Sequence, residues 1–448
     1  MTHDEAFLQA IAENPDDDAP RLIYADWLEE RGDPRGEFIR VQCALARMDE
    51  YDPRQWDLKA QATELLAAHE TAWVGNFADR MNDWCYRRGF LDWVELTGPN
   101  LAILADDLAR RSPAPRLRLV GTERCLPELV ASPLGRRIQR LELAASDGAA
   151  DVEGVTERDM QALISAASFP ELSHLAFAPA IKLGSEGVRL LCRAPWLTRL
   201  RELEVTACSI GAAGVEALAN SPALAGLERL RLRHDDLTAV SMQALAASPH
   251  LARLRVLNLE GNQIDATGTQ ALARNHRLAA LEELNLSGNP IGDAGLSQLA
   301  ASPHLHRLAV LRLHRTRIGA RAAIDLARAA FTATLTRLEL SDNRLFASGI
   351  AALAAGGPFS RLAALDLTGN EIGDEGAQAL AASPQFAGLK SLHLGVNGLR
   401  VWGLKALTSS GNIRSLRVLD LRSNQLGDMG LQVLARWPGL RELKVLNL

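Results

Sequence analysis

Two short segments of this sequence concentrate basic side chains at alternating positions, a spacing suited to binding carboxylates. They are RLRLRHDDL, residues 229–237, and LRLHRTRI, residues 311–318. A guanidinium group presents its N–H donors in one plane and can hold a carboxylate through two hydrogen bonds. We therefore predict a basic site for an acidic protein partner, with side chains that face solvent. Its members are Arg229, Arg231, Arg233, His234, Arg312, His314 and Arg315.

Composition supplies an alternative interpretation of these two segments. The chain holds 44 Arg and 5 Lys at a formal net charge of −5, so arginine is common throughout. Sequence drift in an arginine-rich chain also produces basic clusters. Composition and drift therefore stay an open alternative to a basic binding site.

A second segment with chemical potential is RLIYADWLEERGDPRGEFIRVQ, residues 21–42, where five carboxylates lie among four arginines. Paired carboxylates can act as general acid and base. The predicted helices, however, place most of these carboxylates off their apolar faces, which favours a solvated acidic surface. We expect Asp18 to cap one helix that Gly32 ends, and Asp33 to cap the next. The segment is then a helical cap, with partner docking as an additional role.

The elements that must position the basic clusters follow from a fixed period. Leucine recurs at one constant interval along the body of the chain, and such a period indicates stacked supersecondary units that share a core. These leucines are Leu200, Leu227, Leu254, Leu281, Leu308, Leu335, Leu362, Leu389 and Leu416. The pattern loosens upstream, where LSHLAF and IQRLELA are interpreted as degenerate first repeats.

Each unit has an internal order that predicts a strand, a turn and a short helix. In LNLEGN, Leu257 and Leu259 alternate with polar residues and share one face of a strand. The helix GDAGLSQLAASP follows, and Asp293 is expected to cap it. Between strand and helix a polar residue recurs and predicts a buried ladder bonded to the backbone. The ladder residues are Cys208, Asn262, Asn289, Asn343, Asn370, Asn397 and Asn424, with Asp235 and Thr316 in the two basic repeats.

The repeat LxxLxLxxNxIGDxGxxALA resembles the leucine-rich repeat, specifically its ribonuclease-inhibitor-like subclass. The resemblance implies an α/β fold, a right-handed βα solenoid (horseshoe) with a parallel sheet inside and helices outside. IYADWLEERGDPRGEFIRVQ resembles the short repeat-companion domain that precedes leucine-rich repeats in some bacterial proteins. That second resemblance implies no catalytic activity.

Charge and periodicity predict three regions in this chain. Residues 1–96 carry 21 acidic and 10 basic side chains, and the remainder carries 33 and 39. The acidic beginning, with a net charge of −11, thus precedes a mildly basic body. We predict a helical repeat-companion or capping domain at 1–90, degenerate repeats at 91–199 and regular repeats at 200–448.

Motifs for catalysis, cofactors and metals are missing from the sequence. It contains no GxGxxG, GxxxxGK[ST], HExxH or GxSxG pattern, and its five cysteines form no CxxC pair. No apolar run approaches the about 20 residues that span a bilayer, and the first residues do not resemble a secretory signal. The net negative charge disfavours nucleic acid as a partner. We therefore expect no enzyme activity, no cofactor, no metal, no nucleic-acid partner and no membrane association.

These observations favour a non-enzymatic protein-interaction scaffold in a bacterial cytoplasm, which binds its partner on the concave face of the repeats. One alternative is a regulator of an enzyme, such as a GTPase-activating protein, which has fold analogy as its support. Another is a structural or assembly protein.

The last residues predict self-association. LKVLNL, residues 443–448, begins a tenth regular strand and stops before its ladder position. An open strand edge is a template for another strand. We expect a second copy to pair there, unless the natural chain continues past Leu448 or the strand is frayed.

Overall fold

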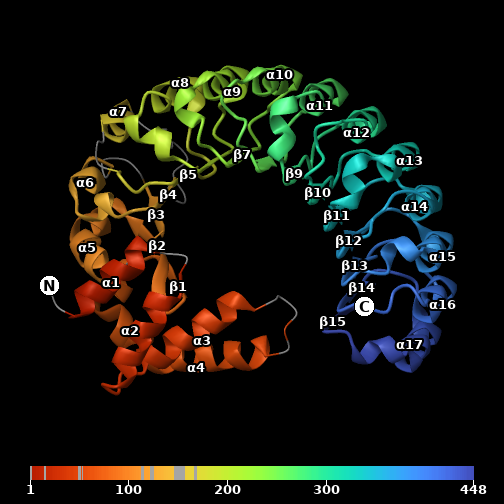
Figure 1. Ribbon diagram of the computed structural model, residues 1–448, viewed down its shortest axis with the longest axis horizontal. Helices are drawn as coiled ribbons and strands as arrows, with labels where there is room; N and C mark the ends of the chain where they lie inside the picture. The colour runs from red at the N-terminus through yellow and green to blue at the C-terminus, as the bar shows by residue number, and fades with distance from the viewer. Residues whose placement is uncertain are drawn as a thin grey trace. The chain divides into compact units, whose positions relative to one another are not determined.

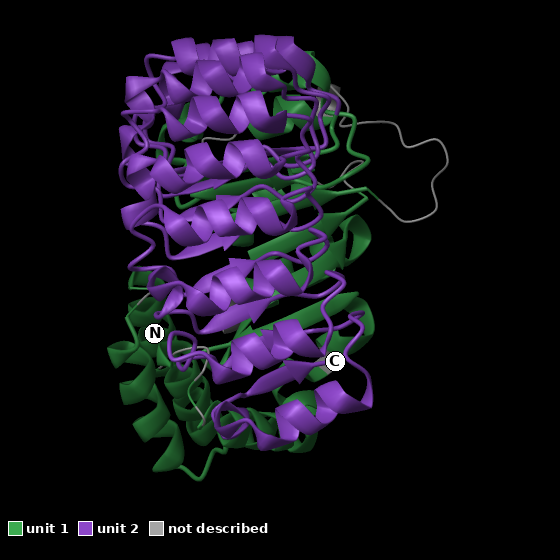
Figure 2. Ribbon diagram, turned by 90° about the vertical axis from the view of Figure 1, so that its right-hand side faces the viewer, with its two compact units in different colours: residues 1–208 green, residues 209–448 purple. Residues whose placement is uncertain are grey.

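The computed structural model describes residues 3–14, 17–48, 52, 54–112, 116–121, 126–145, 157–165 and 169–448. Cys125, one of the five cysteines, lies outside these residues. The chain divides into two compact units, Met1–Cys208 (unit 1) and Ser209–Leu448 (unit 2), which Figure 2 colours separately. The three predicted domain boundaries stay a prediction.

Unit 1 begins with helices, as its sequence pattern predicted. They are α1 (His3–Glu13), α2 (Ala19–Glu29), α3 (Arg35–Arg47), α4 (Gln55–Val74) and the 3-10 helix η1 (Gly75–Arg80). After α2, Gly32 adopts φ +71 and its N–H donates to Glu29 O at 2.9 Å, which ends the helical stretch. Asp33 Oδ1 then accepts a hydrogen bond from Arg35 N at 2.9 Å, directly before α3.

The expectation that Asp18 caps α2 through its side chain is wrong. The residue precedes the helix in a helical backbone conformation, and its carboxylate makes no capping hydrogen bond. The carboxylate is instead buried beside two guanidinium groups, 2.7 Å from Arg47 Nε and 3.2 Å from Arg88 Nε. Since a buried charge needs partners, these two arginines from α3 and from the following hairpin determine where Asp18 points.

The hairpin that follows the helices starts the series of strands in unit 1. β1 (Asp83–Arg87) and β2 (Phe90–Thr97) are antiparallel, and their turn residues Arg88 and Gly89 both have positive φ, as tight hairpins require. The parallel strands β3 (Arg116–Val120), β4 (Arg140–Ala144), β5 (His174–Phe177) and β6 (Glu202–Thr206) then pair in chain order. The described helices of these repeats are α5 (Gly98–Arg111), α6 (Leu126–Ala131), α7 (Glu157–Ser165) and α8 (Gly184–Leu191), with η2 (Leu134–Arg136) and η3 (Pro195–Arg199).

Two apolar clusters join the first helices to this hairpin. Phe90 of β2 packs with Tyr24, Ile39 and Cys43, and Tyr86 of β1 packs against the cluster formed by Phe38, Val41 and Ala62. The helices therefore cover the strand that begins the parallel series, which supports the capping interpretation.

Unit 2 repeats one parallel strand and one helix nine times (Figure 1). Its strands are β7 (Arg229–Arg233), β8 (Val256–Asn258), β9 (Glu283–Asn285), β10 (Val310–Arg312), β11 (Arg337–Glu339), β12 (Ala364–Asp366), β13 (Ser391–His393), β14 (Val418–Asp420) and β15 (Val445–Asn447). Its helices are α9 (Gly211–Asn220), α10 (Ala239–Ala247), α11 (Ala266–Ala273), α12 (Gly292–Ala300), α13 (Ala320–Arg328), α14 (Phe346–Ala355), α15 (Gly373–Ala382), α16 (Val401–Ser409) and α17 (Gly427–Arg436). Short 3-10 helices, η4 (Pro222–Leu224), η5 (His276–Ala280), η6 (Ala330–Ala333), η7 (Pro384–Phe386) and η8 (Pro438–Arg441), lead back toward the strands.

The strand register of unit 2 follows the sequence period. Leu257 pairs with Leu284, which pairs with Leu311 and then with Leu338, so each step along the sheet is one full repeat of the sequence. All four leucines are buried, and the helices lie on one side of the strands (Figure 1). The predicted α/β solenoid of strand–helix repeats is confirmed.

The ladder positions lie between strands and helices, inside the core. Asn262 Nδ2 donates to Leu232 O and to Leu259 O, at 2.8 Å each. Its Oδ1 accepts from the backbone N–H groups of Asp235 at 3.0 Å and Leu237 at 3.1 Å. One side chain thus satisfies buried backbone groups of two successive repeats, which otherwise lack partners where the chain leaves the strand.

The other ladder positions follow the same scheme with local variations. Asn289, Asn343, Asn370, Asn397 and Asn424 each donate to a carbonyl group of the preceding repeat, at 2.7–2.9 Å. Cys208 Sγ lies 3.5 Å from Ala178 O and is fully buried. In the two basic repeats, buried Asp235 accepts from Ile210 N at 3.3 Å, and Thr316 Oγ1 donates to Leu313 O at 2.8 Å.

The expectation that Asp293 caps its own helix is also wrong. α12 has no side-chain cap, and Asp293 Oδ1 instead accepts from Gly319 N, at the start of α13 in the next repeat. Asp374 of α15 does the same for α16, with Arg400 N at 2.8 Å and Gly403 N at 2.9 Å. The stacking places each first-turn carboxylate beside the positive end of the following helix.

We expect Asp374→Ala to lower the free energy of unfolding by about 1–2 kcal/mol, because two helix N–H groups lose their acceptor. Asp428→Ala is the matched control, since Asp428 occupies the same position of α17 and lies in the solvent. Urea unfolding measures both losses, and hydrogen exchange at Gly403 should accelerate only in Asp374→Ala. Equal effects of the two substitutions would show that each carboxylate acts only on its own helix.

Candidate interaction surface

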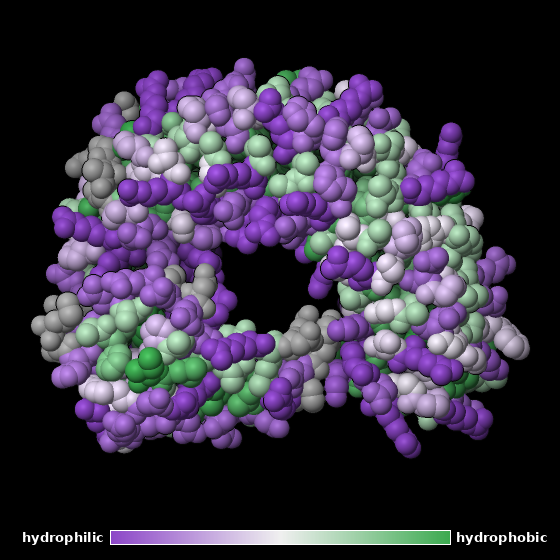
Figure 3. All heavy atoms as spheres, viewed as in Figure 1, coloured by the Kyte–Doolittle hydropathy of each residue, from purple (hydrophilic) through white to green (hydrophobic). Residues whose placement is uncertain are grey.

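The polar side chains of unit 2 form rows across its strand face, opposite the buried leucines. The strand pairing aligns Arg231, in the middle of β7, with the last residue of each strand from β8 to β14, so that their side chains are neighbours about 5 Å apart. In order, this central row is Arg231, Asn258, Asn285, Arg312, Glu339, Asp366, His393 and Asp420. Its charge passes from basic at β7 to mainly acidic beyond β10, and hydrophilic side chains gather over the first strands (Figure 3).

The sequence predicted that Arg312 extends into solvent, and this prediction is wrong. Its guanidinium group lies between Glu283 of β9 and Glu339 of β11, with Nη1 against Glu283 Oε1 and Nε 3.2 Å from Glu339 Oε2. The side chain is 27% exposed. Burial lowers the pKa of this group, but the two carboxylates outweigh burial and raise it. Arg312 therefore already holds two acidic partners within the protein.

The remaining residues of the second cluster also contact acidic groups of the next repeat. Arg315 Nε lies 3.1 Å from Asp342 Oδ2, although the arginine is mostly exposed. His314 Nδ1 lies 2.9 Å from Ser341 Oγ and 3.8 Å from Asp342 Oδ2. The 312–315 cluster is thus part of a mixed-charge network.

The first cluster occupies a single strand. Arg229, Arg231 and Arg233 alternate with buried Leu230 and Leu232 in β7, so the three arginines share the strand face. Burial lowers the pKa of Arg231, neighbouring Arg233 and Arg312 lower it further, and Glu283 opposes them. The structure therefore brings Arg231 into electrostatic range of both clusters.

His234, the fourth residue of the first cluster, lies at the end of β7 and is exposed. Its backbone is left-handed, with φ +55, and its ring lies against Gly261 of the next repeat. A Cβ atom on Gly261 would overlap this ring, and Gly261 itself has φ +70. Glycine at 261 therefore makes room for the imidazole at the edge of the arginine strand.

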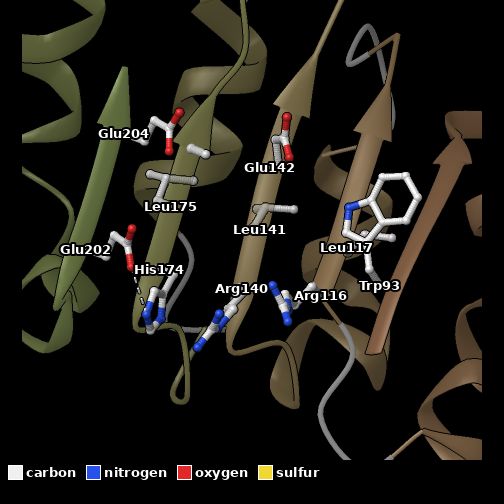
Figure 4. A pocket seen from close by; sticks show the side chains of 11 residues that line it. Trp93, Arg116, Leu117, Arg140, Leu141, Glu142, His174, Leu175, Glu202 and Glu204 are labelled. Carbon is white, nitrogen blue, oxygen red and sulfur yellow. Dashed lines mark ion pairs between the residues drawn. The ribbon is translucent and has the colours of Figure 1, made fainter. Parts of the chain in front are cut away.

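Unit 1 carries a hollow on its own strand face that the sequence analysis missed (Figure 4). Its volume is about 250 Å³, and it opens above Ala176, the small residue between Glu142 and Glu204 in adjacent strands. A neighbouring row contributes Trp93, Arg116, Arg140, His174 and Glu202. The alternation in RLRLV and RLELA, residues 116–120 and 140–144, is the signal that indicates these face positions.

Ion pairs hold the polar side chains around this hollow. His174 Nε2 lies 3.2 Å from Glu202 Oε2, and its Nδ1 lies 2.7 Å from Ser173 Oγ. Arg118 contacts Glu95 at 3.2 Å and Glu142 at 3.1 Å. The walls of the hollow therefore carry positive and negative side chains that are paired with each other.

The described residues contain no group of three or more His, Cys, Asp or Glu side chains placed to hold a metal ion.

Burial raises the pKa of the Cys43 thiol to about 12 and also raises that of Cys85. Both thiols are therefore protonated near neutral pH. No helix in the described part of the chain is long and apolar enough to cross a membrane.

Six segments of the chain match the family model described as Leucine Rich repeat. They are residues 197–219, 250–273, 280–300, 333–354, 362–381 and 412–435, and each follows the strand–helix register described above. The chain is a leucine-rich-repeat protein. The two basic repeats, around β7 and β10, lie between the matched segments of this leucine-rich-repeat chain. Two assignments stay predictions. One places the repeats in the ribonuclease-inhibitor-like subclass, and the other assigns the first residues to the companion domain.

Two solved structures are similar to this leucine-rich-repeat protein at low identity. A TLR13–ssRNA13 complex is 22% identical with a TM-score of 0.45, over 74% of this chain and 43% of that one. An internalin (inlF) from Listeria monocytogenes is 16% identical with a TM-score of 0.40, over 80% of this chain and 86% of that one. At these TM-scores neither likeness bears on what this chain binds. No curated protein matches the chain.

Proposed function

We propose that this leucine-rich-repeat protein is a non-enzymatic protein-interaction scaffold, and that β7 on the strand face of unit 2 binds an acidic segment of its partner. The observation that carries the proposal is the placement of Arg229, Arg231 and Arg233 on one face of a single strand.

Strand geometry relates the three arginines to the backbone of an extended peptide. Residues two apart in a strand are about 7 Å apart, on the arginine strand as on an extended ligand. A segment with Asp or Glu at every second position therefore presents its carboxylates at the spacing of Arg229, Arg231 and Arg233. Each guanidinium group can bind one carboxylate by donating two hydrogen bonds to it.

Two features of the surroundings bear on how Arg231 and Arg312 contribute. Burial lowers the pKa of Arg231, and an ion pair is stronger where water is partly excluded. Arg312 is already held by Glu283 and Glu339, and a ligand there must displace these carboxylates. We therefore assign Arg312, His314 and Arg315 a supporting role, in which they extend the positive field.

The test uses Arg229→Glu with Arg233→Glu, and a fluorescent peptide that alternates Glu with Ser. We expect the wild-type chain to bind this peptide, with an affinity that falls as salt rises. The double variant should bind at least about tenfold more weakly, because repulsion replaces attraction. Arg307→Glu, in an exposed loop, is the control with a single charge reversal.

Equal binding by the wild-type chain and the double variant, with circular dichroism showing that both are folded, would exclude β7 as the acidic-segment site.

GTP hydrolysis by candidate GTPases distinguishes the scaffold from a GTPase-activating regulator. A scaffold leaves that rate unchanged, whereas a regulator raises it.

A further inference from the structure

A second surface of unit 2 lies away from the arginine strand, where β11, β12 and β13 lead into α14, α15 and α16. A broad hollow of about 750 Å³ opens there. Its lining includes Phe346, Glu371, Glu375, Val396 and Arg400.

Phe346 occupies a position at which several other repeats have glycine. It begins α14 with φ +53, and the equivalent Gly292, Gly373 and Gly427 have φ between +57 and +60. A left-handed backbone is unfavourable for a bulky side chain, whereas glycine adopts it freely. The ring is also 42% exposed, although large aromatic side chains are usually buried. An exposed aromatic surface is therefore present at this position.

Val396 is a second exposed apolar residue in the lining of this hollow. This β-branched residue has φ +54, and it is 52% exposed. Positive φ recurs at the equivalent positions of other repeats, with glycine at some (Gly369) and other residues elsewhere (Asp342). Two exposed apolar side chains with a left-handed backbone thus line one hollow.

The charged groups of the hollow are mainly carboxylates without a partner in the protein. Glu371 and Glu375 are exposed, and among the described residues neither side chain takes part in a hydrogen bond or an ion pair. Asp374 differs, because it accepts two backbone N–H groups of α16. Among the described residues of this lining Arg400 is the one cation, and its Nε points to Gln425 Oε1 at 3.4 Å. The hollow therefore combines apolar rims with net negative charge.

We propose that this hollow binds a segment of a partner protein in which a large apolar side chain stands next to Lys or Arg. The apolar side chain packs between Phe346 and Val396, and the cation pairs with Glu371 and Glu375. This site is opposite in charge to the arginine strand and independent of it. A chain with both sites can hold an acidic and a basic segment at the same time.

The test selects short random peptides, displayed on phage, on the immobilised full chain, and measures the enriched peptides by fluorescence anisotropy. We expect enrichment of sequences that pair Lys or Arg with Leu, Phe or Trp. Phe346→Gly should weaken their binding about tenfold or more without lowering the melting temperature, since glycine relieves the backbone. Glu371→Gln with Glu375→Gln should remove most of the salt dependence of binding.

Two controls separate this site from other surfaces. Trp56→Ala removes an aromatic side chain that is 70% exposed on α4, and it should leave binding unchanged. Arg229→Glu with Arg233→Glu should also leave binding unchanged, so failure of the acidic-segment site does not affect this result. The proposal is overturned if no basic–apolar peptide is enriched, or if such peptides bind Phe346→Gly as tightly as the wild-type chain.

Discussion

Replacing Asn289 by leucine is expected to lower the free energy of unfolding by about 3–5 kcal/mol. The side chain is fully buried, and Nδ2 donates to Leu259 O at 2.9 Å and to Leu286 O at 3.0 Å. Its Oδ1 accepts from Ile264 N at 2.9 Å. Leucine has a similar size but no polar atoms, so Leu286 O and Ile264 N lose their ladder partner, each at a cost of about 1–3 kcal/mol, whereas Leu259 O keeps Asn262 Nδ2. Urea unfolding followed by circular dichroism measures the loss.

Thr316→Asn is the matched control for this ladder variant. It places a carboxamide at the ladder position where the β10 repeat has a hydroxyl group, and we expect a neutral or stabilising effect. A loss of less than about 1 kcal/mol for Asn289→Leu would contradict the energetic role of the ladder.

Gly89→Ala is expected to destabilise unit 1 by about 2–4 kcal/mol. Gly89 has φ +85, and an added Cβ atom would overlap Ile39, whose Cα lies 2.7 Å from the position of that atom. The left-handed backbone costs about 1–2 kcal/mol, and overpacking against α3 adds about 1–3 kcal/mol. Because Ile39 belongs to the first helices and Gly89 to the hairpin, the loss reports how strongly the two depend on each other.

Gly32→Ala provides the comparison. Gly32 also has positive φ, at +71, but an added Cβ atom meets nothing within 4 Å. We therefore expect a loss of only about 1–2 kcal/mol, from the backbone alone. Thermal unfolding of both variants tests the packing of helices on hairpin, and equal losses would show that Ile39 yields without cost.

The helix caps show what could not be predicted from one helix at a time. Asp18 and Asp293 both stand where a helix begins, and sequence rules assign each to its own helix. In the structure Asp18 meets Arg47 and Arg88, and Asp293 meets Gly319 of the next repeat. The deciding partners belong to later elements of the chain, and local spacing contains no information about them.

The candidate site divides in the same way between sequence and structure. Alternation along β7 predicted that its three arginines share a face, since side-chain direction in a strand has a period of two. That Arg312 is held between Glu283 and Glu339 depends on neighbours in two other strands. The hollow lined by Phe346 and Val396 was not predicted, because these two residues belong to different repeats and isolated exposed apolar residues are common.

The sequence by itself determined the repeat. A fixed period, leucines in alternation and a polar residue after each strand require units that stack in register, because one unit alone cannot bury its apolar face. Only the tertiary structure decided which charges meet. Stacking brings side chains from different repeats within hydrogen-bonding distance, and that distance determines whether an arginine is already paired or a glutamate is left for a partner.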